Sequence, residues 1–103
     1  MKVVLTEEAQ RQARTERRWW REHRDAKHLF TAELRAARQV LASAPKHEVY
    51  GRFEGQPVRR VLLEKTRCHV YYVVVEHENL VRIIAVWGAT RGGDPGKVEP
   101  LLR

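Results

Sequence analysis

The chain has 103 residues, 43% of them hydrophobic and 32% charged, which is the balance of one soluble globular domain. Its net charge of +7 favours an anionic partner such as nucleic acid, a ribosome or an acidic protein segment. No apolar run approaches the roughly 18 residues of a membrane-spanning helix. The start, "MKVVLTEEAQ", turns polar too soon for a signal peptide. With only Cys68 available, no internal disulfide can form, so we expect a cytoplasmic protein with no membrane association.

The N-terminal half predicts a strand followed by a helix. "KVVL", at 2–5, has the pattern of a short strand. Thr6 can cap a helix, because its hydroxyl accepts from a free N–H group, and acidic residues follow in the first turn. We expect this helix to run from Glu7 to about His23, with a thin inward stripe made by Ala9, Ala13 and Trp20.

A second helix is predicted after the polar turn at 24–27. It should reach about Ser43, because Pro45 cannot continue it. Its apolar face has helical spacing and comprises Phe30, Leu34, Ala37 and Leu41, widened by Val40 and Ala44. Two helices joined by so short a link form an antiparallel hairpin.

The C-terminal half predicts strands. We expect a loop over 46–57 with a short strand at Val49–Phe53, then strands at 58–65, 69–76 and 80–88. The last two are apolar in both alternating sets, so both should be central in the sheet. Simple alternation places Tyr72 and Val74 on one face of their strand and Tyr71, Val73 and Val75 on the other. In the next strand it places Ile83, Ala85 and Trp87 on one face and Ile84 and Val86 on the other.

The predicted order is therefore β-αα-βββ, an α+β domain with a helix hairpin packed on one face of a mainly antiparallel sheet. We expect a single domain over residues 1–95 and a flexible C-terminal tail over 96–103.

Three segments resemble the ParE/RelE superfamily of toxins from type II toxin–antitoxin modules. "RRWWREHRDAKHLFTAELRAARQVLASAP" is similar to the helix hairpin of ParE-type members. "VRRVLLEKTRCHVYYVVV" is similar to their central strands, and "IIAVWGATRGGDP" to their last strand and its basic end. The resemblance covers roughly residues 2–95 and implies a cytoplasmic toxin that forms a hetero-oligomer with a cognate antitoxin protein.

The superfamily implies two mechanisms. RelE-like members cut mRNA in the ribosomal A site with arginines, lysines and often a tyrosine, because a 2′-hydroxyl must lose a proton and the phosphate must be held. ParE-like members bind DNA gyrase and need a surface rather than an acid–base set. One fold hosts both activities, so the choice depends on individual residues.

The residues at the family's functional positions favour the ParE-like mechanism. His69 lies where RelE-like enzymes carry an arginine, Arg91 stands alone where they carry a basic pair, and no tyrosine follows Tyr72. "VWGATRG" is closer to a ParE-type "VWHxxRG" pattern, from which Gly88 departs, as Cys68 departs from a common tyrosine.

We therefore expect a gyrase inhibitor without catalytic residues, cofactor or metal. Its partner-binding residues would be Arg91, Trp87, Arg67, His69, Arg60 and Trp19. The alternative is a ribosome-dependent mRNA endonuclease that uses His69, Arg91 and Arg67. A third class is a basic RNA-binding or inactive relative.

Each of these residues also has a structural interpretation. Cys68 and His69 would point to opposite faces of a strand, so they make no nucleophile–base pair. His69 could make one ordinary hydrogen bond, Trp87 could be a core residue, and Trp19 could be shielded by the hairpin. The stripe on the first helix, formed by Arg11, Arg14, Arg18 and Arg21, could be a solvated face or a basic binding face.

Overall fold

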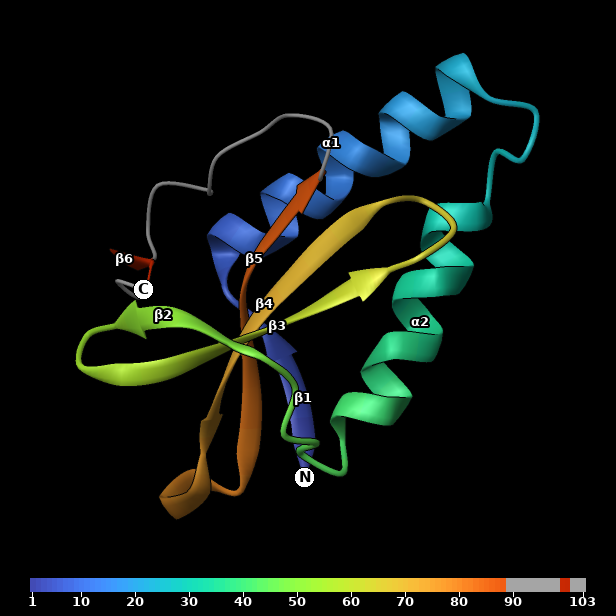
Figure 1. Ribbon diagram of the computed structural model, residues 1–103. Helices are drawn as coiled ribbons and strands as arrows, with labels where there is room; N and C mark the ends of the chain where they lie inside the picture. The colour runs from blue at the N-terminus through green and yellow to red at the C-terminus, as the bar shows by residue number, and fades with distance from the viewer. Residues whose placement is uncertain (89–98, 101–103) are drawn as a thin grey trace.

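The computed structural model describes residues 1–88 and 99–100, which form a sheet with two helices against one of its faces (Figure 1). In chain order the elements are β1 (Lys2–Leu5), α1 (Glu7–His23), α2 (Leu29–Leu41), β2 (Val49–Phe53), β3 (Gln56–Leu63), β4 (Cys68–Val75), the 3₁₀ helix η1 (Glu76–Glu78), β5 (Leu80–Gly88) and β6 (Glu99–Pro100).

The sheet is mainly antiparallel, as the sequence predicts. Its strand order is β1-β5-β4-β3-β2-β6, and β1 runs parallel to β5 while the other neighbours are antiparallel. The helix hairpin supplies the long connection after β1 that a parallel pairing needs. α1 packs on β5 and α2 lies beside β3, so the helices cover the centre of the sheet from one side (Figure 1). The α+β prediction is confirmed.

α1 has the predicted bounds because local signals set them. The Thr6 hydroxyl accepts from the N–H of Ala9 at 3.1 Å, as a helix cap does. Ala9 and Ala13 are buried as predicted, and Trp20 packs against the core while staying partly exposed. The sequence did not reveal that Gln12 and Glu16 are also buried on this face.

α2 is shorter than predicted at both ends and stops before Ser43. The chain leaves the helix through Ala44, whose φ of 50° is left-handed, just before Pro45. The predicted apolar face is confirmed for Phe30, Leu34 and Leu41, which are buried. The prediction that Val40 widens this face is wrong, since its side chain is 56% exposed.

β3 begins and ends two residues earlier than predicted. It begins at Gln56 because the left-handed pair Glu54 and Gly55 makes a tight hairpin that places Phe53 opposite Gln56. It ends at Leu63 because the carboxylate of Glu33, from α2, binds the next turn. That carboxylate accepts from the backbone N–H groups of Lys65 at 2.7 Å and Thr66 at 3.0 Å, and from the Thr66 hydroxyl at 2.6 Å.

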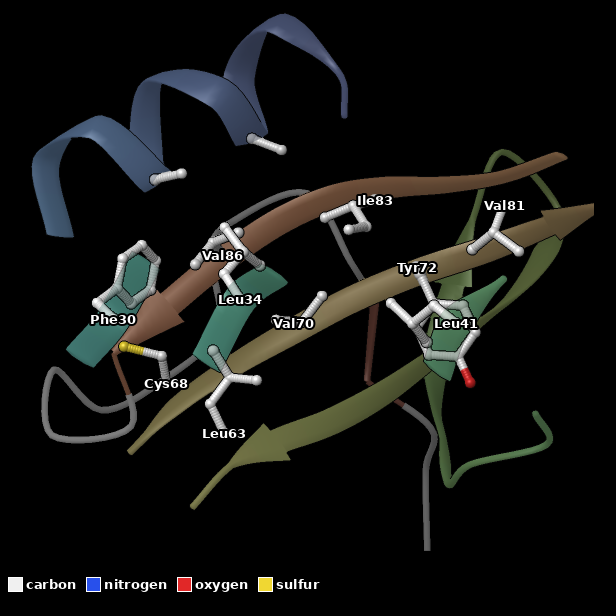
Figure 2. Packing of buried hydrophobic residues seen from close by; sticks show 12 residues of the cluster. Phe30, Leu34, Leu41, Leu63, Cys68, Val70, Tyr72, Val81, Ile83 and Val86 are labelled. Carbon is white, nitrogen blue, oxygen red and sulfur yellow. The ribbon is translucent and has the colours of Figure 1, made fainter. Parts of the chain in front are cut away.

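The sheet buries apolar residues on both faces, and Figure 2 shows the cluster on the helix side. The predicted alternation holds in β4, where Tyr72 and Val74 belong to the helix-side cluster and Tyr71 to the far-face cluster. It fails in β5, because a bulge interrupts the register with β4. As a result Ile84 joins Ala85 on the far face, while the helix side receives Ile83 and Val86.

The C-terminal predictions fall largely outside the described residues. Arg91 lies there, as do 96–98 and 101–103 of the expected tail. Glu99 and Pro100 form β6, which pairs with Arg52 and Gly51 of β2. No helix among the described residues has the length and apolar character that crossing a membrane requires.

Candidate functional site

The sheet face opposite the helices gathers three of the predicted partner-binding residues. His69 and Trp87 are cross-strand neighbours, where β4 begins and β5 ends. Arg60, on β3, lies opposite Tyr71 of β4. Trp87 packs against the far-face cluster while staying partly exposed, so the structural interpretation as a strand-end residue and the binding interpretation both fit it.

Arg60 is held by groups from three segments. Its guanidinium carbon lies 4.4 Å from the ring centre of Tyr50, and its Nη2 donates to the two carboxylate oxygens of Glu48 at 3.3 and 3.4 Å. Burial alone would lower the pKa of Arg60, but hydrogen bonds with Tyr71 and Glu48 outweigh it, and the pKa is raised. The cation is therefore permanently charged and already partnered within the protein.

His69 is kept neutral near pH 7 by its surroundings. Partial burial lowers the pKa of its imidazole, and the positive charges of Arg60 and Arg67 lower it further, against a smaller opposing effect of Glu48. Its ring meets Tyr71 edge-on at 6.1 Å between ring centres. A neutral imidazole between cations can accept a hydrogen bond or a proton, so His69 is the group on this face best suited to act as a base.

Arg67 and Trp19 line a separate pocket of about 440 Å³ at the same end of the sheet. Arg67 lies in the β3–β4 turn with a φ of 61°, in the turn that Glu33 holds. Trp19 is 39% exposed, and Arg24 lies 4.9 Å from its ring centre. The structure thus divides the predicted residues that it describes between the far face and this pocket, and the charge of Arg67, which lines the pocket, also acts on His69 of the far face.

Cys68 lies on the other side of the sheet from His69, as predicted. It is 1% exposed and belongs to the helix-side cluster, where it points toward the helices together with Leu63 (Figure 2). Its sulfur lies 3.7 Å from a carboxylate oxygen of Glu16. This geometry rules out direct contact with His69 and gives Cys68 a packing role.

Metal ligands do not gather in the described part of the chain, where no group of three or more His, Cys, Asp or Glu is placed to hold an ion. The arginine stripe of α1 is solvent-exposed at Arg11, Arg14, Arg18 and Arg21, and Arg11 is paired with Glu8.

The partners of Arg60 were missed by the sequence analysis. Glu48 lies just before β2 and Tyr50 lies within it, in a segment whose sequence predicts a loop with a short strand. Only the pairing of β2 with β3 brings these two residues to Arg60. An aromatic residue and a carboxylate two positions apart are too common to signal such a site. The buried Tyr71 could be placed on this face from alternation alone.

Comparisons with known proteins bear on the fold. No protein-family model matches the chain, and no curated protein matches its sequence. Among solved structures it is similar to the isolated RelE toxin of E. coli, with a TM-score of 0.53 and 17% identity over 84% of this chain and 82% of that one. The protein therefore has the fold of the RelE/ParE toxin superfamily, as the sequence resemblance implied. At this identity the likeness shows the fold alone.

Proposed function

We propose that this protein is the toxin of a type II toxin–antitoxin module, that it acts by binding DNA gyrase, and that a cognate antitoxin neutralises it in a hetero-oligomer. The fold and the net charge of +7 support the toxin role, since a cationic body suits an acidic antitoxin and a DNA-bound enzyme.

The choice of gyrase rests on how Arg60 is engaged. A phosphate-cleaving site needs cations directed at the phosphate and a base paired with an acid. Here the guanidinium of Arg60 binds Glu48 and lies over the ring of Tyr50. It also forms a hydrogen bond with Tyr71, which is only 1% exposed. Among the described residues of this face, His69 supplies a base, while the carboxylate of Glu48, which also acts on His69, is bound to Arg60. Such a face suits adhesion better than proton transfer.

The second candidate is a ribosome-dependent mRNA endonuclease, and His69 is the observation in its favour. A neutral imidazole near Arg60 and Arg67 could accept the proton of a 2′-hydroxyl, and Arg91 could hold the phosphate. Under this mechanism His69 would be catalytic, whereas under the gyrase mechanism it would contribute only surface.

The two candidates separate in one pair of assays on the purified protein. We expect inhibition of gyrase-dependent DNA supercoiling and intact mRNA on programmed ribosomes. Trp87→Ala and Arg91→Ala should each weaken gyrase inhibition about tenfold, as loss of a central contact does. His69→Gln should reduce it much less, and Gln39→Ala, an exposed control on α2, should leave it unchanged.

Cleaved mRNA together with undisturbed gyrase would replace the first candidate with the second, and loss of that cleavage in His69→Gln would identify the base. If neither machine is affected, the protein is an inactive or RNA-binding relative. In cells, the same distinction appears as filamentation with a DNA-damage response or as an immediate halt of protein synthesis.

A further inference from the structure

A groove on the helix side of the molecule collects positive charge away from the far face. It has a volume of about 630 Å³ and lies between α1, α2 and the outer edge of β1. We call it the basic groove, and its cations are Lys2, Arg14, Arg17 and Arg38. The described residues that line it include no Asp or Glu.

The cations of the basic groove have no carboxylate partner among the described residues. The ion pairs that the described residues form join Arg11 to Glu8, Arg60 to Glu48 and Arg82 to Glu78, and all three lie outside the groove. Two of the groove's guanidiniums are oriented by neutral acceptors instead. Arg17 donates to the Thr31 hydroxyl at 3.3 Å, and Arg38 donates to the carbonyl of Val3 at 3.1 Å.

The edge of β1 makes the groove rich in donors rather than acceptors. Backbone groups alternate along a strand, and the N–H of Lys2 and that of Thr6 reach the β5 side, so the groups of Val3 and Leu5 face away from β5. Their carbonyls already accept hydrogen bonds from Arg38 and Gln10. What the strand edge still offers a ligand is mainly N–H groups, and the cationic side chains lie beside it.

This chemistry selects the kind of ligand. A peptide strand added to β1 would need acceptors as well as donors along the edge, and side chains of the two helices occupy those acceptors. A phosphate chain needs donors and positive charge only. The cations come from three different elements that line the groove, which suits a polymer of phosphates better than a single ion.

We propose that the basic groove binds the phosphate backbone of nucleic acid, without reading its sequence. The site is separate from the far face and does not depend on whether gyrase or the ribosome is the target. Both of those machines carry nucleic acid, so the groove would add affinity wherever the far face docks.

The test is binding of a labelled mixed-sequence oligonucleotide, single-stranded and duplex, measured by fluorescence anisotropy over a range of salt. The logarithm of the affinity should fall linearly with that of salt concentration. The triple variant R14Q/R17Q/R38Q should bind about tenfold or more weakly, with a salt slope smaller by about 2 to 3, because each lost phosphate contact removes about 0.7 to 0.9.

Two matched variants separate a site from mere net charge. K27Q/K46Q/R52Q removes the same charge from exposed positions outside the groove and should change the affinity less than about threefold. R14K/R17K/R38K keeps the charge and should keep most of the affinity. Circular dichroism spectra and thermal unfolding would show that each variant is folded.

The proposal is overturned if both charge-removing triples weaken binding equally, since the effect would then follow net charge. It is also overturned if poly-glutamate of matched charge, or vesicles of anionic lipid, compete as well as the unlabelled oligonucleotide. Neither gyrase nor ribosomes enter the measurement, so either outcome leaves the proposed target untouched.

Discussion

Arg60 and His69 would carry like charges if both were protonated, and this repulsion adds to the effect of burial on the imidazole. The pKa of His69 therefore lies below the ordinary 6.5 in the folded protein, while the unfolded chain titrates near that value. Below about pH 6.5 the unfolded chain binds more protons than the folded one, so the free energy of unfolding falls as the pH drops toward the folded pKa.

We expect His69→Gln to lose part of this acid sensitivity, measured as the difference in unfolding free energy between two urea titrations, one above and one below pH 6.5. Arg60→Gln should raise the pKa of His69 in an NMR titration, because a positive neighbour is removed. An imidazole midpoint unchanged by Arg60→Gln would mean that the charge of Arg60 does not contribute to the lowered pKa of His69.

Gln12 of α1 forms a hydrogen bond with β5 just beyond the point where β1 ends. β1 stops at Leu5, opposite Ile83, so β5 continues past its parallel partner. The N–H of Val86 then faces α1, and the buried side-chain oxygen of Gln12 accepts from it at 2.7 Å. A buried donor left without a partner costs about 1–3 kcal/mol.

We expect Gln12→Leu to lower the free energy of unfolding by about 1–3 kcal/mol, since it keeps the volume but removes the acceptor. The control Gln39→Leu, at an exposed position on α2, should change it by less than about 0.5 kcal/mol. Hydrogen exchange at the Val86 amide should quicken in the first variant only. A fully stable Gln12→Leu protein would show that Val86 finds another acceptor.

The contrast between α1 and β3 shows which element bounds a sequence can predict. Thr6 and the acidic turn after it act within α1, so its bounds were predictable from neighbours in the chain. The end of β3 depends on Glu33, which lies on another element and reaches the turn only after folding. The candidate site likewise has features that local sequence predicts and features that it does not. Alternation predicts that His69 and Cys68 diverge, but the partners of Arg60 require strand pairing that no local pattern encodes.

Across the whole molecule, the strand pairs differ greatly in the number of residues in the loop that each pairing closes. β3, β4 and β5 follow one another through short turns, whereas the pairing of Lys2 with Leu80 joins the two ends of most of the chain. Closing a long loop costs conformational entropy before its contacts form, so local hairpins should precede it. We therefore expect the β3–β4–β5 unit to form the folding nucleus and β1 to dock after the transition state.

Two core truncations test this order by stopped-flow folding in urea. Val70, fully buried between Val61 and Val86, lies at the centre of the nucleus, and Leu5 packs on the core from β1. Val70→Ala should mainly slow folding, and Leu5→Ala should mainly speed unfolding, provided that each costs more than about 0.6 kcal/mol. If Leu5→Ala slows folding as much as Val70→Ala does, β1 is already paired with β5 in the transition state, and the entropy of closing that loop does not order the pathway.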